Sequence, residues 1–373
     1  MPDNPESPLG RTSKPIDEPA PVRPGEELDA ARIDVAIRSA VPGLSGLPEV
    51  REFPSGASNL TYLIRYPERE FVLRRPPFGY KAKSAHDMRR EATVLHALQP
   101  VYPYVPKVVA FFDDPEILGA DFYLMEPVRG IIVRRDLPRG FELSPRDARR
   151  LCFNLIDRMI ELHQVDYRAA GLAEMGKGNG YAQRQIAGWS DRYRKSRTDD
   201  VGDFEMVMRW LQACTPAEDS GTCIIHNDFR FDNVVLNCKN PMEIIGVLDW
   251  EMATLGDPLM DLGNSLAYWV QADDDRAYLD MRCQPTHLPG MLTRHEVIAY
   301  YGEKTGRYVA NFDFYLVYGL FRLAVIAQQI YYRYFHGQTR NPHFAGFGRA
   351  VNYLQGRCER LIGDSRQTYE RAG

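Results

Sequence analysis

The sequence predicts an α+β protein with two lobes, a sheet-rich amino-terminal lobe over residues 28–128 and a mainly helical carboxyl-terminal lobe over residues 129–373. Between about residues 45 and 128, apolar and polar residues alternate and are interrupted by turn residues, which is typical of antiparallel strands. After Gly130, apolar residues recur at helical spacing. Because ligands commonly bind between lobes, we expect a cleft at the junction.

The composition gives no sign of nucleic acid or a membrane as a required partner. Charged residues make up 26% of the chain, and the formal net charge is only -4. The six cysteines are scattered, without a C-x-x-C pair or the spacing of metal ligands. We therefore expect reduced thiols in a cytoplasmic protein.

Two segments are excluded as membrane or secretion signals. Residues 1–27 have no apolar stretch that could act as a secretory signal, and their content of Pro, Asp, Glu and Ser predicts a disordered tail. The most apolar long stretch begins at Phe314 and is interrupted by Arg322, Gln328 and Gln329. We expect a buried core helix there and not a membrane span.

The amino-terminal lobe is expected to be a small sheet with one inserted helix, after a first helix from near Leu28. Segment 50–77 predicts successive antiparallel strands. Segment 84–98 predicts a helix that begins at Ser84. Two further strands are expected in segments 105–114 and 120–128.

The carboxyl-terminal lobe is expected to be helical around one β-rich island, residues 222–251. Segment 144–165 has helical periodicity, and Thr293 with Glu296 forms a capping-box pattern that marks another helix start. The island contains IIHNDFRFDN at residues 224–233, where polar residues directly follow an apolar strand. On local grounds this cluster is a turn, because Asn and Asp side chains bond to nearby backbone groups.

The order of motifs along the chain gives this turn a second interpretation. His226-x-Asp228-x-x-x-x-Asn233, followed by a strand that ends in Asp249, resembles the catalytic loop and metal-binding Asp of the protein-kinase-like superfamily. The form is that of aminoglycoside phosphotransferases and choline kinases. The resemblance covers residues 45–270, and FVLRRPP, GYAQRQIAGW and LDWEMATLGDPLMDLG are similar to the kinase domain fused to some acyl-CoA dehydrogenases. It implies a protein-kinase-like fold with the active site between the lobes.

The resemblance also implies roles for the residues of the carboxyl-terminal lobe. Asp228 would orient the acceptor hydroxyl and accept its proton. Arg230 would neutralise the transferring phosphate, and His226 would brace the loop, although a packed or capping histidine is an equally good interpretation. Asn233 and Asp249 would bind Mg²⁺ through oxygen atoms.

In the amino-terminal lobe, the resemblance implies a nucleotide-binding site for ATP. The residues concerned are Ser55, Gly56, Ser58 and Asn59 over the phosphates, Arg74 with its helix partner Glu91, and Glu126 and Val128 at the hinge. Segment 55–59 taken alone is an ordinary hairpin turn. The Arg74–Glu91 pair could instead be a lobe-stabilising salt bridge, and Arg75, Lys81 or Lys83 could make the phosphate contact. Arg74 stands where the wider superfamily has Lys, and the two are not interchangeable.

The segment after Asp249 narrows the acceptor class. Gly256-Asp257-Pro258 follows so soon that no long activation segment fits, so a small-molecule acceptor is favoured over a protein. Asp257 and Asp261 resemble a structural element of the family. The aromatic residues between Tyr315 and Phe335 could shape an apolar acceptor pocket, but their helical spacing favours core packing.

The resulting hypothesis is an ATP- and Mg²⁺-dependent kinase that phosphorylates a hydroxyl of a small molecule. The resemblance favours a hydroxyacyl-CoA acceptor. Two alternatives stay open: an aminoglycoside kinase, although the slight basic excess after Gln271 does not suggest a pocket for a polycation, and a nucleotide-binding pseudokinase with a regulatory role.

Overall fold

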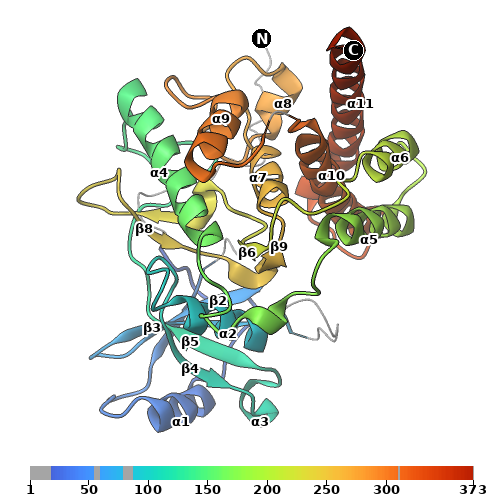
Figure 1. The fold of residues 1–373 in the computed structure, drawn as a ribbon. Coiled ribbons are helices and arrows are strands. Elements are labelled where there is room, and N and C mark those ends of the chain that lie inside the picture. The colour runs from blue at the N-terminus through green and yellow to red at the C-terminus, as the bar shows by residue number, and fades with distance from the viewer. Residues whose placement is uncertain (1–17, 54–58, 79–86, 310, 373) are drawn as a thin grey trace, which may run out of the picture.

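The computed structural model describes residues 18–372 except residues 54–58, 79–86 and 310, and it shows the two lobes that the sequence predicts (Figure 1). The sheet of the amino-terminal lobe lies in the lower half of the view. The long helices of the carboxyl-terminal lobe lie in the upper half. The α+β class and the kinase-like, two-lobed arrangement are therefore confirmed.

The amino-terminal lobe is one antiparallel sheet with short helices on both faces. Its strands are β1 (Glu49–Glu52), β2 (Leu60–Arg65), β3 (Glu70–Arg75), β4 (Val108–Phe112) and β5 (Phe122–Met125). They pair in the order β1-β2-β3-β5-β4. Its helices are α1 (Ala30–Ala40), α2 (Met88–Leu98) and α3 (Pro115–Leu118).

The alternation of side chains along β3 divides this lobe into two cores. Phe71 and Leu73 are buried in a cluster with residues of α1. Val72 faces the other way and is buried with residues of α2, in a cluster that continues into the carboxyl-terminal lobe. Since successive residues of a strand point to opposite faces, Arg74 lies on the same face as Val72 and is directed toward α2 and the second lobe.

Helix α2 starts later than its sequence predicted. Its first residue is Met88 and its N-cap is Asp87, whose carboxylate accepts a hydrogen bond of 2.9 Å from the Arg90 N–H. The expected start, Ser84, lies outside the described residues. An Asp side chain is as good a cap as Ser, and the structure uses Asp87, which the sequence analysis did not consider.

The carboxyl-terminal lobe contains long helices around two short strand pairs. Its helices are α4 (Pro145–His163), α5 (Tyr181–Ser196), α6 (Glu205–Ala213), α7 (Pro258–Leu266), α8 (Arg276–Met281), α9 (Arg294–Thr305), α10 (Asp313–Phe335) and α11 (Phe347–Ala372). Single 3₁₀ turns are η1 (Ala173–Met175), η2 (Phe231–Asn233), η3 (Trp250–Met252) and η4 (Pro342–Gly346). Strand β6 (Cys223–Ile225) pairs with β9 (Thr254–Gly256), and β7 (Val234–Leu236) pairs with β8 (Ile244–Val247).

The start of helix α9 agrees with the sequence. The Thr293 hydroxyl accepts a hydrogen bond of 3.1 Å from the Glu296 N–H, and the Glu296 carboxylate accepts one of 2.8 Å from the Thr293 N–H. Both halves of the predicted capping box are therefore present.

Helix α10 is the apolar stretch that the sequence placed in the core. It has the length and hydropathy of a membrane span, but most of it is buried inside the fold. It packs against α5, α7 and α11. At the crossing with α7, Gly319 and Gly263 meet so closely that a Cβ on either would collide with backbone atoms of the other helix. This contact fixes the rotation and depth of α10 against α7.

Two residues that the sequence assigned to the tail, Ala20 and Arg23, contact the sheet. Ala20 forms two backbone hydrogen bonds with Glu52 at the end of β1, of 2.7 and 2.9 Å. The buried Glu52 carboxylate accepts a further bond of 2.9 Å from the Arg23 N–H. This segment therefore lies along the outer edge of β1.

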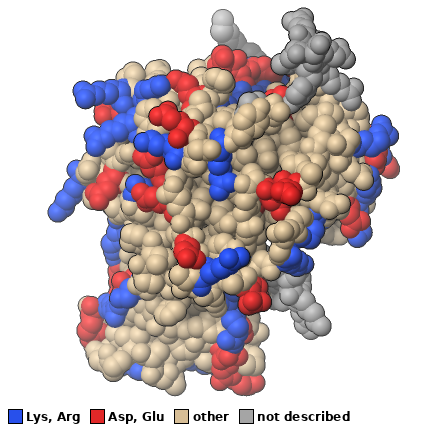
Figure 2. Space-filling model, viewed as in Figure 1, with Lys and Arg blue, Asp and Glu red and all other residues tan. Residues whose placement is uncertain are grey.

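Charged side chains are interspersed on the surface. On the face shown in Figure 2, Lys and Arg alternate with Asp and Glu, and uncharged residues cover most of the centre. This agrees with the small net charge of -4.

Candidate active site

The polar cluster of the sequence forms the loop between β6 and β7, and a carboxylate of α7 holds its start. Asp261 is fully buried and accepts hydrogen bonds from the backbone N–H groups of His226, at 2.9 Å, and Asn227, at 2.7 Å. It also contacts His163 Nε2 at 3.1 Å. Burial alone would raise the pKa of Asp261, but the hydrogen bonds from His163 and His226 hold it below its usual value. Asn227 has a φ of 66°, a conformation that Asn tolerates better than most residues.

The His226 ring connects this loop to the strand that leads to Asp249. Its Nε2 lies 2.9 Å from the Leu248 carbonyl oxygen, and its Nδ1 lies 3.2 Å from the Asp228 backbone nitrogen. A carbonyl can only accept and an amide N–H can only donate. The contacts therefore require a neutral ring that carries its proton on Nε2.

Asp228 lies at the centre of a compact polar group. The Arg230 guanidinium contacts its carboxylate with Nε at 2.9 Å and Nη2 at 3.0 Å. The Asn233 amide donates to the Asp228 carboxylate and to its carbonyl oxygen, each at 2.8 Å. The guanidinium also stacks on the Tyr268 ring at 4.2 Å. These contacts fix the direction of the Asp228 carboxylate.

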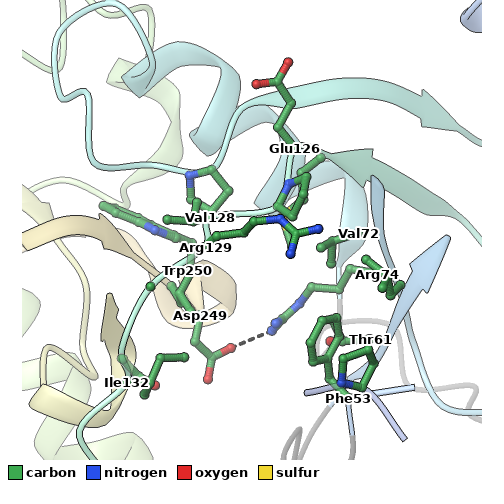
Figure 3. Close-up of a pocket in the computed structure, with 18 of the residues that line it drawn as sticks. Phe53, Thr61, Val72, Arg74, Glu126, Val128, Arg129, Ile132, Asp249 and Trp250 are labelled. Atoms are coloured by element: carbon green, nitrogen blue, oxygen red, sulfur yellow. Dashed lines mark hydrogen bonds and ion pairs between the residues drawn. The ribbon is translucent and has the colours of Figure 1, made fainter. Parts of the chain in front are cut away.

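Arg74 brings three carboxylates together at the junction of the lobes. It forms an ion pair with Glu91 of α2 at 3.2 Å, with Asp249 at 2.5 Å and with Glu251 at 3.5 Å. Figure 3 shows the Arg74 side chain reaching from β3 toward Asp249. Burial by itself lowers the pKa of Arg74, but the charges of Glu91 and Asp249 raise it well above its usual value.

Asp249 follows β8 after one residue, Leu248, whereas the sequence predicts that the strand ends in Asp249 itself. Its φ of 67° turns the chain sharply into η3, so that the carboxylate points into the space between the lobes. The Asp249 side chain is 36% exposed to solvent. Burial raises the pKa of Asp249 and the Arg74 charge lowers it, with a net fall below the usual value.

A cavity of about 570 Å³ lies between the two lobes, and Arg74, Asn233 and Asp249 are among the residues that line it. Its apolar walls come from both sides, with Phe53 and Val72 on the sheet and Ile132 and Trp250 beyond the hinge (Figure 3). Its polar lining includes Arg74, Glu91, Glu126, Asn233 and Asp249. An apolar space with a few polar groups at one end is the usual form of a small-ligand site.

The predicted phosphate loop can be placed only in part. Ser55, Gly56 and Ser58 lie outside the described residues, as do Lys81 and Lys83. Asn59 is buried, and its amide donates a hydrogen bond of 2.8 Å to the Glu251 carboxylate. Arg75 is directed away from the cavity, with its guanidinium 3.7 Å from the centre of the Phe78 ring.

The predicted hinge residues line the cavity in different ways. Val128 faces it in Figure 3, whereas the Glu126 carboxylate points away from Arg74 and Asp249. That carboxylate instead pairs with Arg69 at 2.7 Å and with Lys107 at 3.3 Å. The Glu126 backbone N–H donates to the Lys107 carbonyl oxygen at 2.8 Å, so neither this N–H nor the carboxylate is directed to Arg74.

Two carboxylates of the site escaped the sequence analysis. Glu251 contacts Arg74 and Asn59, and Asp232 lies 3.3 Å from the Arg230 guanidinium. Burial raises the pKa of Asp232, and the Arg230 charge acts against that rise. Glu251 lies two residues after the predicted metal ligand Asp249, and Asp232 lies directly before the predicted ligand Asn233. This closeness in sequence could have marked both carboxylates as members of the site.

The chemistry of Asn233 and Asp249 suits a magnesium ion. Asn233 uses its amide nitrogen on Asp228, and Asp249 holds Arg74 through Oδ1. Within the described residues, Asn233 Oδ1 and Asp249 Oδ2 accept no hydrogen bond. Both residues line the same cavity, and amide and carboxylate oxygens are the ligands that Mg²⁺ prefers. The described residues contain no cluster of three or more His, Cys, Asp or Glu side chains that would form a complete protein cage.

A sheet-rich and a helical lobe, joined by a hinge and enclosing a cleft with these polar groups, define the class of kinase-like phosphotransferases. The particular family follows from the sequence, because a profile of the phosphotransferase enzyme family matches residues 49–291. The chain belongs to this family.

Solved structures share the fold. A candidate aminoglycoside phosphotransferase from Ralstonia eutropha is 28% identical, with a TM-score of 0.76 over 91% of this chain and 99% of that chain. A choline kinase from Cryptosporidium parvum is 12% identical, with a TM-score of 0.59 over 90% of this chain and 97% of that chain. A GDP and kanamycin complex of an aminoglycoside phosphotransferase is 16% identical, with a TM-score of 0.62 over 87% and 98% of the two chains. The choline kinase and the kanamycin complex are only 12% and 16% identical to this chain, so their similarity shows a shared fold and nothing more.

Among curated proteins, the relatives include acyl-CoA dehydrogenase family members. Member 10 of Mus musculus is 35% identical over 79% of this chain, and member 11 of Rattus norvegicus is 32% identical over 85%. The chain spans only 27% and 41% of the lengths of these two proteins.

Proposed function

We propose that the protein is a kinase that transfers the γ-phosphoryl group of ATP to a hydroxyl group of a small molecule, with Mg²⁺ as its cofactor. The observation that carries the proposal is that Arg74, Asn233 and Asp249 line one interlobe cavity, with Asp228 hydrogen-bonded to Asn233 at 2.8 Å. These residues come from both lobes and from separate segments of the chain.

The nucleotide is assigned to the cavity between the sheet and the hinge. The adenine ring would lie between apolar side chains of the two walls, such as Val72 and Leu248. Val128 carries a backbone N–H without a partner among the described residues, which suits a hydrogen bond to the base edge. Arg74 at the inner end supplies a positive charge for the phosphates, and residues 55–59 remain proposed phosphate contacts. GDP in a neighbouring structure supports a nucleotide in this fold.

Asp228 is the proposed proton acceptor. As the acceptor hydroxyl attacks the γ-phosphorus, its proton passes to the Asp228 carboxylate, and the bond to the leaving ADP oxygen breaks. Asn233 and Arg230 keep the carboxylate in one orientation. Arg230 also places positive charge beside the transferring group, and His226 holds the backbone of the loop.

Mg²⁺ would be held by Asn233 and Asp249, and when bound it neutralises negative charge on the nucleotide phosphates. For this role Asp249 needs only its Oδ2 atom, so Arg74 can keep its contact with Oδ1.

A hydroxyacyl-CoA is the proposed acceptor, in a cytoplasmic protein with neither nucleic acid nor membrane as partner. Support comes from two relatives that carry the name acyl-CoA dehydrogenase. Neighbouring structures with choline kinase or kanamycin in their names support a small-molecule acceptor in general. In this proposal residues 28–128 bind the nucleotide, and residues 129–373 supply the catalytic loop and the acceptor site.

A pseudokinase is the second candidate, and one contact favours it. Arg74 lies 2.5 Å from Asp249, so the cation expected on the phosphates already occupies part of the metal-binding carboxylate. If Arg74 engaged both oxygen atoms of Asp249 in the nucleotide complex, ATP would bind without productive metal.

The test is Mg²⁺-dependent ADP production from ATP with a panel of acceptors: hydroxyacyl-CoAs, free hydroxy acids, choline and kanamycin. We expect acceptor-stimulated turnover in the wild-type chain and a loss of at least about a hundredfold in Asp228→Ala, because general-base assistance is typically worth that much. Asp273→Ala, which removes an exposed carboxylate far from the loop in sequence, is the matched control and should leave the rate unchanged. ATP binding without turnover for every acceptor would establish the pseudokinase.

A further inference from the structure

Helix α10 places an arginine inside the carboxyl-terminal lobe without a carboxylate partner in the described part of the chain. Arg322 is 2% exposed, and within the described residues its guanidinium forms no ion pair. Its one hydrogen bond among them runs from Nη2 to the thioether sulfur of Met252, at 3.3 Å. A thioether is a weak acceptor, and a guanidinium has five N–H donors.

The remaining surroundings of Arg322 are aromatic. Its guanidinium lies 5.2 Å from the centre of the Trp189 ring of α5. Tyr318, one turn earlier on α10, has a buried hydroxyl that donates no hydrogen bond within the described residues. Burial raises the pKa of Tyr318 to about 12, and the nearby Arg322 charge acts against that rise. Two buried groups that can donate hydrogen bonds to an anion therefore lie side by side.

Arg322 is connected to the catalytic loop by two short routes. Met252, which accepts its hydrogen bond, also accepts one of 3.0 Å through its carbonyl oxygen from Asn227, the neighbour of Asp228. The other route passes through Tyr268, which lies near both Arg230 and Arg322. Burial raises the pKa of Tyr268 to about 12, and the charges of Arg230 and Arg322 both oppose that rise. Arg322 therefore lies close to residues that contact the loop of Asp228.

A buried charge without a counter-charge is unfavourable in a folded protein, because removal of an ion from water costs several kcal/mol that no partner returns. The close crossing of Gly319 and Gly263 fixes the segment of α10 that carries Arg322. The helix therefore cannot rotate to bring the guanidinium to water. A ligand that supplies the missing negative charge would remove this cost.

We propose that Arg322 recognises an anionic group of the acceptor, a carboxylate or a phosphate, which displaces the Met252 sulfur while the acceptor hydroxyl faces Asp228. The inference rests on the proposed kinase function and makes it more specific. Arginine binds either anion through two parallel hydrogen bonds, and Met252 is only partly buried and flexible, so it can give way. A cationic acceptor would meet an unpaired positive charge at this position and is disfavoured.

The experiment compares acceptors that share one hydroxyl and differ in charge. The probes are γ-hydroxybutyrate, its neutral amide and the amino alcohol of the same length, with γ-hydroxybutyryl-CoA as the phosphate-bearing form. KM and kcat for ADP production are measured for the wild type, Arg322→Lys and Arg322→Met. Binding is followed independently by tryptophan fluorescence, and Trp189→Phe identifies the signal that comes from the ring beside Arg322.

We expect the wild type to bind an anionic probe at least about tenfold more tightly than the neutral amide, because a hydrogen bond between charged groups is worth that factor or more. Arg322→Met should abolish this preference by raising KM for the anionic probe alone. Arg322→Lys, which keeps the charge and loses the fork, should retain part of it. Preference for the free acid or for the CoA ester identifies the source of the anion.

Equal affinity for anionic and neutral probes in the wild type, or unchanged preference in Arg322→Met, would overturn the inference. If Arg322→Met fails to fold, the wild-type comparison and Arg322→Lys still decide it. If anionic probes bind with a Trp189 signal but no acceptor yields ADP, the kinase proposal fails and the anion site stands.

Discussion

Arg74 is the residue on which both lobes depend for charge balance. It faces Glu91 from its own lobe and Asp249 and Glu251 from the other, and its side chain is only 13% exposed. A lysine would bring one compact ammonium to the same place, whereas the planar guanidinium can contact several carboxylates at once. The arginine therefore suits a site in which three carboxylates converge.

Removal of this charge should destabilise the fold. We expect Arg74→Met to lower the free energy of unfolding by about 3–5 kcal/mol, because it leaves buried carboxylates without a partner. Arg74→Lys should lower the free energy of unfolding by less, since it keeps the positive charge but loses the planar guanidinium. Urea denaturation measures both.

Arg89→Met is the matched control for this prediction. Its ion pair with Asp113 is exposed on both sides, so its removal should change the free energy of unfolding by no more than about 1 kcal/mol. A loss in Arg74→Met no larger than in Arg89→Met would contradict the assigned charge balance.

For single residues, the sequence predicted which side chains belong to the site better than it predicted which other side chains they contact. The Arg74–Glu91 pair followed from the resemblance, and the structure contains it. The contact of Arg74 with Asp249 was not predictable, since it depends on how closely the lobes approach. Arg322 entered the sequence analysis only as an interruption in an apolar stretch, because a linear pattern does not show whether a buried charge has a partner.

Among the elements, α7 has the clearest effect on the candidate site. Its Asp261 carboxylate holds the first two backbone N–H groups of the loop between β6 and β7, and His163 of α4 supports it. The sequence analysis classed Asp261 as structural, and these contacts agree with that role. A helix outside the loop therefore holds the backbone directly before Asp228.

Asp261→Asn tests how much the Asp261 carboxylate stabilises the fold and how this stabilisation depends on pH. An amide has one oxygen for several donors, so we expect a loss of about 3 kcal/mol at pH 7. The pKa of Asp261 is lowered in the folded protein, so its contribution is complete above the unfolded pKa of about 4 and is lost as the pH falls through the folded value. The difference between wild type and variant should therefore be constant from about pH 5 to 7 and shrink below about pH 4.

Urea titrations of both chains over this pH range make the measurement. Asp273→Asn, an exposed position, serves as the control and should match the wild type throughout. A difference that grows on acidification would have the wrong sign for a carboxylate that is stabilised in its charged form.

The elements themselves were largely predictable, because most carry local signals. Thr293 with Glu296 encodes the start of α9, and the alternation along β3 encodes its two faces. The start of α2 was misplaced because both Ser84 and Asp87 can cap a helix. The segment around Ala20 and Arg23 was assigned to the tail because its composition predicts disorder. Its backbone pairing with β1 and the Arg23–Glu52 ion pair join residues far apart in the sequence, and composition does not show such contacts.

Over the whole molecule, one hydrophobic cluster crosses the junction between the lobes. It includes Val72 and Leu95 on one side and Trp250 and Leu155 on the other. Backbone groups also meet there, since the Val247 N–H donates to the Tyr104 carbonyl at 2.7 Å. Shared burial of this kind couples the stabilities of the two lobes.

We therefore expect both lobes to unfold together. All four tryptophans, Trp189, Trp210, Trp250 and Trp269, belong to the carboxyl-terminal lobe. Their fluorescence therefore reports mainly on that lobe and, through Trp250 beside Tyr102, on the junction. Far-ultraviolet circular dichroism reports on both lobes. The two urea curves should share one midpoint. An earlier transition in circular dichroism, with fluorescence unchanged, would mean that the sheet unfolds separately and that the junction couples the lobes weakly.

The arginine at position 74 also has a consequence for chemical labelling. Reagents that find kinases by acylating an amine beside the nucleotide phosphates need a side chain that can lose its proton and act as a nucleophile. A guanidinium stays protonated, and the carboxylates around Arg74 raise its pKa further. A survey of cellular kinases by lysine capture would therefore obtain no adduct at this position, and the missing adduct would carry no information on whether the protein binds a nucleotide.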